Sequence, residues 1–318
     1  MNARLGLFGK LAAMGDFVAY NAAMPTAREL DSWLQAGVDT VIRRGKNLPP
    51  YPVRFLFRDT AHSGACVGVF VPSQDGVGRK FPLAAFVYLD MPVAIHRFPF
   101  LPAAYAPFLD GAAALLAHHP TADPNALLQH LAALPVPAPQ ELEEARLWGH
   151  QALDATPGPA LLEALFGPIA GGVQYHGLNM FLTACNQLRG HAPGQAGTVL
   201  ECRASDDVQL VFWLRLAYEV LGWRRAPPVL FWSGADSRDP RLMVSLGTPD
   251  PAAFHYLADA TLKSERLWPT TTDNARSIDH GRQSLDPSII KALDPPCATA
   301  SQLLAALIAP SLVAPAPE

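Results

Sequence analysis

The chain has 318 residues, of which 50% are hydrophobic and 16% are charged, and its formal net charge is -4. This composition supports a folded core and excludes an intrinsically disordered chain. The net acidity and the lack of a long basic block argue against a general nucleic-acid-binding protein, which needs many cations to neutralise phosphates.

The cysteine spacing and the hydropathy of the chain indicate where in the cell the protein is expected. The cysteines are widely spaced and form no C-x-x-C pair, so they predict neither a zinc site nor a disulfide framework. Lys10 and Asp16 interrupt the apolar N-terminal residues before a secretory signal would be complete. The apolar stretch from Val208 to Leu221 is too short to span a bilayer. We therefore expect a cytoplasmic protein without membrane insertion.

The first element with a distinctive composition is the run from Gly6 to Phe17, which places Lys10 and Asp16 among glycines. Glycine allows close backbone approach and positive φ, so such a run can hold charged side chains at fixed surface positions. Thr26 and Glu29 then have the spacing of a capping box, and apolar residues at helical spacing follow, which predicts a helix from about residue 26 to 42.

Three apolar segments follow and are predicted to be strands: 53–57, 65–71 and 81–89. The second is almost entirely apolar, which is typical of a strand covered on both faces. A second glycine run, Pro72 to Leu83, starts where that strand ends and contains Asp75 and Arg79. We therefore expect it to form the loop between two central strands.

In the rest of the chain, segments with helical periodicity alternate with short apolar segments typical of strands. Helices are predicted near 102–118, 141–153, 175–188, 207–221, 250–257 and 300–308, and strands near 198–202, 229–232 and 242–246. A Pro/Ala-rich connection lies near 120–140, and five tryptophans, including Trp148 and Trp232, are predicted in the core. This alternation predicts an α/β fold, a three-layer α/β/α sandwich around a mixed sheet. We divide it into a domain of residues 1–260 and a C-terminal extension of residues 261–318.

Known catalytic patterns are incomplete in this sequence. Gly9-Lys10 resembles part of a phosphate-binding loop, but that motif needs glycine where Arg4 stands and a hydroxyl where Leu11 stands. The chain has no G-x-S-x-G elbow and no H-E-x-x-H pair. We therefore expect no catalytic residue, no metal site and no cofactor.

The charged residues of the two glycine runs allow two interpretations. Asp16 and Asp75 could pair for acid/base work or metal binding, with Lys10 and Arg79 as charge partners. Alternatively, each aspartate bonds turn amides, and the neighbouring arginine forms an organising ion pair. Both remain open from the residues alone.

In these runs the chain resembles the TagF (ImpM) family of type VI secretion accessory proteins. That family begins close to G-x-x-G-K-L-P-x-x-G-D-F-V and later has P-S-x-D-x-V-G-R-x-F-P-L. The matching residues here are Gly6, Gly9, Lys10, Leu11, Gly15, Asp16, Phe17 and Val18, then Pro72, Ser73, Asp75, Val77, Gly78, Arg79, Phe81, Pro82 and Leu83. Ala12 replaces the usual proline. The resemblance is specific over residues 6–89, weaker over 228–257 and absent after 263.

The resemblance implies a three-layer α/β fold and a non-enzymatic role. TagF-like proteins restrain secretion-system assembly after translation, by engaging its forkhead-associated scaffold protein. We therefore expect a negative regulator that binds that protein, without predicting an oligomeric state. The expected partner-binding or loop-organising residues are Lys10, Asp16, Phe17, Ser73, Asp75 and Arg79. The alternative is a ligand- or phosphate-sensing protein, or a hydrolase, that uses the same charged residues.

Overall fold

The computed structural model describes residues 5–61, 63–118, 123–190, 197–234, 237, 240–259, 261–262 and 264–313. Over these residues, nine strands form one mixed sheet in the order β2-β1-β5-β4-β3-β7-β8-β6-β9. The strands are β1 Leu5–Lys10, β2 Phe17–Tyr20, β3 Val53–Arg58, β4 Ala65–Val71, β5 Leu83–Leu89, β6 Thr198–Arg203, β7 Val229–Ser233, β8 Arg241–Leu246 and β9 Leu267–Pro269. All neighbours are antiparallel except β6 and β9, which are parallel.

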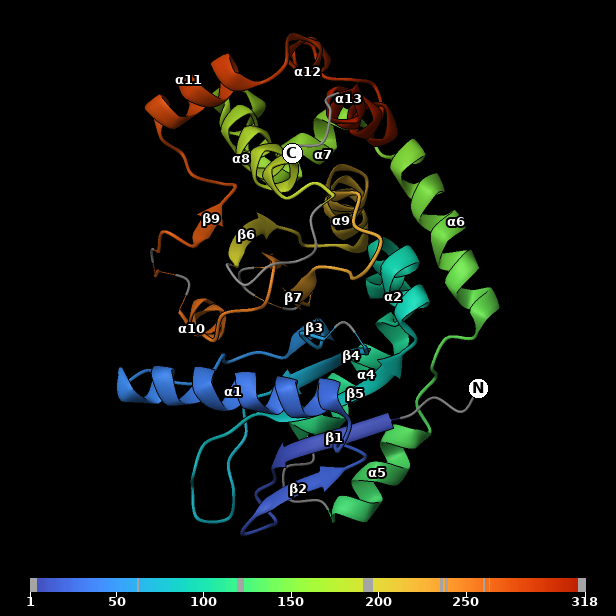
Figure 1. Ribbon diagram of the computed structural model, residues 1–318, viewed down its shortest axis with the longest axis vertical. Helices are drawn as coiled ribbons and strands as arrows, with labels where there is room; N and C mark the ends of the chain where they lie inside the picture. The colour runs from blue at the N-terminus through green and yellow to red at the C-terminus, as the bar shows by residue number, and fades with distance from the viewer. Residues whose placement is uncertain are drawn as a thin grey trace.

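The sheet consists of two parts that come from different regions of the chain. We call β2-β1-β5-β4-β3 the N-terminal half-sheet and β7-β8-β6-β9 the C-terminal half-sheet. They meet where β3 pairs with β7, with Val53 opposite Ser233 and Leu56 opposite Leu230. In Figure 1, β1 and β2 lie at the lower edge, and β6 and β9 lie toward the upper left.

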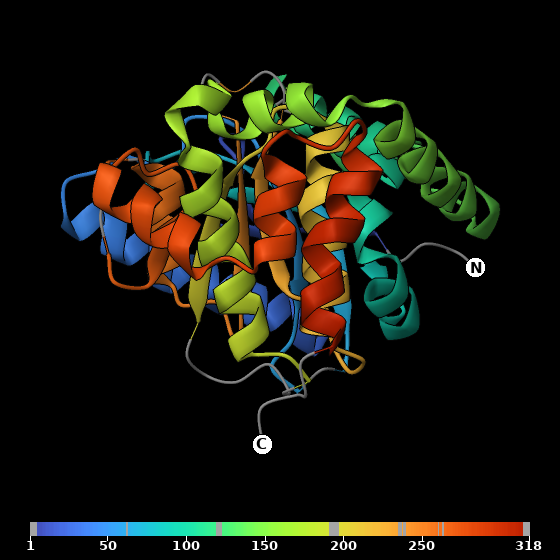
Figure 2. The ribbon, with the colours of Figure 1, turned by 90° about the horizontal axis from the view of Figure 1, so that it is seen from above.

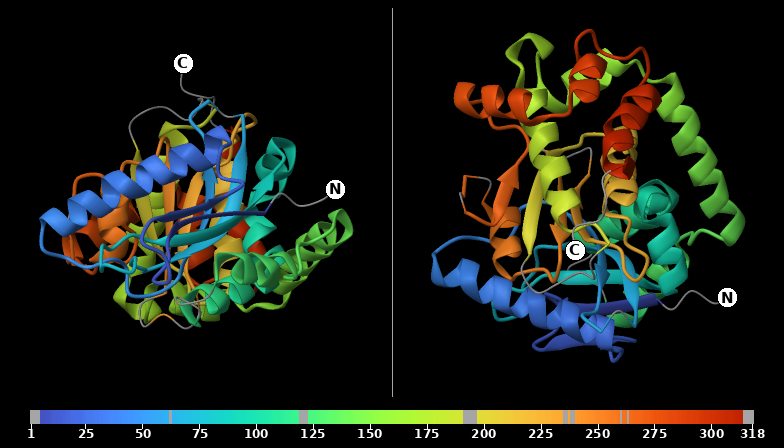
Figure 3. Two further views of the ribbon diagram at one scale, coloured as in Figure 1. Left: turned by 90° about the horizontal axis from the view of Figure 1, so that it is seen from below. Right: turned by 45° about the horizontal axis from the view of Figure 1, so that its top comes forward.

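One face of the sheet is covered by α1, Pro25–Arg43, and α10, Ala252–Ala258. The left panel of Figure 3 shows α1 on one side of the strands and the helices of the middle of the chain on the other. Trp33 of α1 stacks on Phe231 of β7 with ring centroids 4.6 Å apart. This aromatic contact joins α1, from the N-terminal region, to the C-terminal half-sheet.

The opposite face carries the remaining helices, which surround a second, larger hydrophobic cluster (Figures 1 and 2). They are α2 Met91–Arg97, α3 Leu101–Ala104, α4 Ala106–His118, α5 Pro124–Ala132, α6 Pro139–Ala155, α7 Gly158–Phe166, α8 Val173–Gln187, α9 Asp207–Leu221, α11 Ala275–Ser284, α12 Pro287–Leu293 and α13 Ala300–Val313, with 3-10 turns at Phe98–Phe100 and Ile169–Gly171. The arrangement of helices, mixed sheet and helices confirms the predicted α/β fold.

The residues after 260 contribute to both the sheet and a helical layer. Strand β9 pairs with β6, with Val199 opposite Leu267. Helix α13 packs on α9, and its Leu303 and Leu307 are fully buried in the larger cluster. Lys263 and residues 314–318 lie outside the described residues.

The capping box predicted at Thr26 and Glu29 is wrong. Helix α1 begins one residue earlier, at Pro25, whose missing N–H suits the first helical position. The Thr26 hydroxyl instead donates to the buried carboxylate of Asp59, at 2.9 Å, and Glu29 accepts from the backbone N–H of Thr60, at 2.8 Å. Both side chains therefore connect α1 to the end of β3 rather than cap the helix.

Other boundaries also differ from the sequence pattern. The predicted helix 102–118 breaks at Tyr105 into α3 and α4. Within the Pro/Ala-rich connection, α5 takes up residues 124–132, residues 133–138 form the link to α6, and residues 120–122 lie outside the described residues. Trp148 is 40% exposed on α6, so its predicted core position is wrong.

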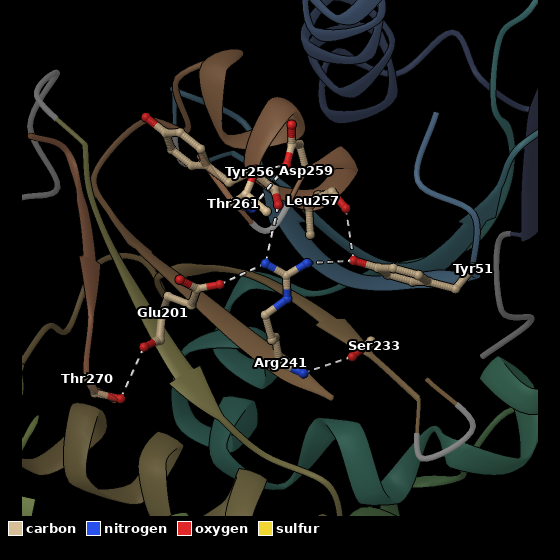
Figure 4. A network of polar contacts seen from close by, with 9 residues as sticks. All are labelled: Tyr51, Glu201, Ser233, Arg241, Tyr256, Leu257, Asp259, Thr261 and Thr270. Carbon is tan, nitrogen blue, oxygen red and sulfur yellow. Dashed lines mark hydrogen bonds and ion pairs between the residues drawn. The ribbon is translucent and has the colours of Figure 1, made fainter. Parts of the chain in front are cut away.

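A polar network around the buried Arg241 connects β6, β8 and the segment before β3 to α10 (Figure 4). Arg241 of β8 pairs with Glu201 of β6, at 2.7 Å, and donates to the backbone carbonyl of Tyr256, at 3.3 Å. It also donates to the hydroxyl of Tyr51, at 3.0 Å, which lies before β3 and itself donates to the carbonyl of Leu257. The network holds the C-terminal end of α10 in place near the boundary between the two half-sheets.

Among the described residues, no single helix combines the length and apolar composition needed to cross a membrane, and only the bent pair Met91–Ala104 with Ala106–His118 passes by length and composition together.

The larger hydrophobic cluster is expected to dominate the free energy of unfolding. Phe181 is 0% exposed, and its ring centroid lies 4.7 Å from that of Trp213. Phe181→Ala should lower the free energy of unfolding by about 3–5 kcal/mol, because it removes buried area and leaves a cavity. Leu147→Ala on the exposed face of α6 should change it by less than about 0.5 kcal/mol. Chemical denaturation of both variants checks this, and equal losses would contradict it.

Candidate functional site

The two glycine runs predicted from the sequence meet at one end of the sheet. The first run turns from β1 to β2, and the second connects the neighbouring strands β4 and β5. The Gly76 N–H donates to the carbonyl of Met14, at 2.9 Å, and the Ser73 hydroxyl donates to the carbonyl of Lys10, at 2.8 Å. We call residues 10–17 and 72–82 together the paired-loop site.

Asp75 lies at the centre of the paired-loop site, and its side chain is 0% exposed. One carboxylate oxygen accepts from Lys10 Nζ, at 3.0 Å, and from Arg79 Nε, at 2.6 Å. The other accepts from the backbone N–H groups of Val77, at 3.1 Å, and Arg79, at 2.9 Å. A buried charge is tolerated when it is paired and hydrogen-bonded in this way.

The environment of Asp75 sets its protonation state. Burial alone would raise the pKa of the carboxyl group, but hydrogen bonds from Lys10, Arg79 and the Val77 amide hold that pKa well below its ordinary value. Asp75 is therefore ionised at neutral pH and acts as the fixed anion on which both loops converge.

Gly9 allows the two loops to approach. Its φ is +131°, a region that L side chains rarely adopt, and an added Cβ would lie 2.1 Å from the carbonyl oxygen of Pro82. Gly9 therefore permits β1 to pass close to the end of the second loop, which brings Lys10 to Asp75.

Asp16 and Phe17 lie on the outer side of the site. Asp16 accepts from the N–H of Phe17, at 2.8 Å, so it bonds its own turn. The Phe17 ring packs edge to face on Phe81, at 4.9 Å between centroids, and Lys10 Nζ lies 5.5 Å from its centroid. Phe17 nevertheless remains 44% exposed.

The structure thus brings together Lys10, Ser73, Asp75 and Arg79, and it leaves Asp16 in a different role. Arg79 pairs with Asp75 and donates from Nη2 to the carbonyl of Gly15, at 2.8 Å. The contacts follow the second interpretation, in which aspartates bond turn amides and arginine forms an organising ion pair. The carboxylates of Asp16 and Asp75 share no hydrogen-bond partner among the described residues.

Sequence reasoning missed two exposed apolar residues at this site, Val77 at 73% and Met14 at 39%. Val77 stands between Gly76 and Gly78, and an apolar residue between two glycines in a charged loop is the signal that could have identified it. Together with Phe17 and the 61% exposed side chain of Arg79, these residues form the outer surface of the site.

Metal-ligand clusters and cysteine thiols are the other groups that could carry chemistry. Within the described ranges, no group of three or more His, Cys, Asp or Glu side chains is arranged to hold a metal ion. Burial raises the pKa of the Cys66, Cys185 and Cys202 thiols, which keeps them protonated and unreactive.

The low pKa of Asp75 predicts an acid-dependent contribution to stability. As pH falls below about 4, the unfolded chain takes up a proton at this position before the folded protein does, so the contribution is complete above that pH and is lost below it. Asp75→Asn should therefore lower the melting temperature most at neutral pH. The difference from wild type should shrink by about pH 3. Thermal melts across this range check it, and a difference that grows on acidification would contradict it.

Comparison with known proteins finds a family similarity over the region of the paired loops. Residues 6–134 match the model of the TagF N-terminal domain, described as type VI secretion system-associated. A solved structure, the crystal structure of PA0076 from Pseudomonas aeruginosa PAO1, has 19% sequence identity and a TM-score of 0.46, covering 82% of this chain and 96% of that chain. No curated protein matches. Residues 6–134, which include the whole paired-loop site, are therefore similar to the TagF N-terminal domain, a type VI secretion system-associated domain.

Proposed function

We propose that this protein is a post-translational negative regulator of type VI secretion system assembly. It acts in the cytoplasm by binding the forkhead-associated scaffold protein of that system, and the paired-loop site is its contact surface. The observation that supports this most is the position of Asp75, a buried anion that fixes two loops while exposed side chains surround it.

The residues of the site divide into two roles. Lys10, Ser73 and Asp75 are buried or half-buried and bond to the opposite loop or to each other, so they organise the loops. Asp16, Phe17 and the neighbouring Val77 and Arg79 are exposed and are available to a partner. Aromatic and arginine side chains are enriched among the residues that dominate binding energy, which suits Phe17 and Arg79 to this role.

Preorganisation favours binding by this surface. Ordering a flexible loop on association costs free energy, and that cost is smaller when the loop is already held. Here the second loop is held to the first by the Gly76–Met14 and Ser73–Lys10 hydrogen bonds and by the ion pairs of Asp75.

The same contacts favour a binding role over catalysis. Both oxygens of Asp75 are engaged by donors, and a proton acceptor with so low a pKa is a weak general base. We therefore propose a non-enzymatic protein.

The cleanest test uses Val77, because its side chain is 73% exposed and its replacement disturbs little packing. Val77→Asp should weaken binding to the purified forkhead-associated protein by at least about tenfold, which corresponds to about 1.4 kcal/mol. The melting temperature should stay close to that of wild type. Isothermal titration calorimetry measures the affinity.

Leu312→Asp is the matched control, since Leu312 is 60% exposed on α13 and is far from the paired loops in the sequence. It should bind as wild type does. Wild-type affinity in folded Val77→Asp and Asp16→Ala variants would reject the surface assignment, whereas failure of the wild-type protein to bind would reject the proposed partner.

A further inference from the structure

A cavity of about 620 Å³ opens above the junction of the two half-sheets. It lies between α4, which packs on the N-terminal half-sheet, and the segment of residues 204–207 that leads into α9. Its volume falls in the range of small-molecule sites, which often form where two structural units meet. None of the described residues that line it belongs to the paired-loop site.

The floor of the cavity is formed where β3 pairs with β7. Arg54 of β3 is the register partner of Trp232 of β7, and both line the cavity. A Cβ at Gly234 would lie 1.8 Å from Arg54 Nη1, so the glycine provides the room in which the guanidinium lies. On the α4 side, the wall combines alanines, among them Ala106, Ala113 and Ala117, with Asp110 and His118.

The polar lining has an excess of negative charge. Among the described lining residues, the acidic and basic side chains are Asp110, Asp206, Asp207, Arg54 and His118. Arg54 is already neutralised by Asp110, through an ion pair at 2.5 Å, and its side chain is only 13% exposed. The carboxylate of Asp206 is occupied as the cap of α9, where it accepts from the backbone and the side chain of Gln209.

Asp207 differs from its two acidic neighbours. It is half-buried and makes no hydrogen bond or ion pair with any residue that the structure describes. Burial raises the pKa of Asp207, and the charges of Asp110 and Asp206 raise it further, whereas the charge of Arg54 lowers it in part. A half-buried carboxylate beside two others is stabilised by a cation.

We propose that this cavity binds an organic cation, an alkylammonium or guanidinium group, with its charge at Asp207 and its carbon chain against Trp232 and the alanines of α4. The same chemistry is offered by a free diamine and by a lysine or arginine side chain of a bound protein. An anionic ligand is disfavoured, because Arg54, the arginine among the described lining residues, is already paired with Asp110.

The test titrates the full-length protein with agmatine, which carries an ammonium and a guanidinium group, and with succinate as an anionic probe. Agmatine should bind, and Asp207→Asn should weaken it by at least about tenfold at neutral pH. Ala114→Phe, which extends a ring from the α4 wall, should also weaken it. Asp39→Asn is the control, since Asp39 pairs on the exposed face of α1 with Arg43.

The proposal is overturned if agmatine does not bind to wild type, if Asp207→Asn binds it with unchanged affinity, or if succinate binds better. Agmatine that displaces the forkhead-associated protein identifies the natural cation as a partner side chain, and agmatine that binds without displacing it identifies a free amine. Both results support the cavity assignment. Neither bears on Val77, so this inference can fail while the proposed function stands.

Discussion

The antiparallel pairing of β3 with β7 is the contact on which the rest of the structure depends. It joins strands from distant parts of the chain, so its formation has a large loop-closure cost in entropy. Burial on both faces of the sheet offsets that cost. Phe55 and Phe231 are register partners beneath α1, while Leu56 and Leu230 are register partners in the larger cluster. Without this seam, each half-sheet would expose a long apolar edge, which favours aggregation.

The same seam places both candidate sites. The N-terminal end of β3 lies beside the C-terminal end of β4, because Val53 is opposite Phe70, so the cavity floor and the second glycine loop lie at one end of the sheet. Lys80 of that loop donates to the side chain of Asn47, at 2.7 Å, in the segment that leads into β3. A partner that engages the paired loops would therefore approach the end of the molecule where the cavity lies.

Local pattern identified most of the elements and failed at particular residues. Strand β4 was predictable because it is apolar throughout and buried on both faces. The role of Thr26 was not predictable, because its hydroxyl bonds to the tertiary partner Asp59 instead of capping the helix. The short strand β9, Leu267–Pro269, contains a proline and lacks a strand pattern, and its pairing with β6 alone makes it a strand. The break at Tyr105, by contrast, has a local signal in Pro107, which lacks the N–H that would continue the preceding helix.

By itself, the sequence determined the α/β class, the order of the main elements and the identity of the paired loops, because periodicity and glycine spacing are local properties of the chain. The tertiary structure alone decided which charges meet. Asp75 rather than Asp16 became the shared anion, since the positive φ of Gly9 and the β4–β5 connection bring Lys10 and Arg79 to it. The sequence alone could not distinguish Asp207 from Asp206. In the structure, Asp206 accepts two hydrogen bonds from Gln209 of α9, and Asp207 accepts none from any residue that the structure describes. Such distinctions depend on contacts between residues far apart in the chain, which no local pattern encodes.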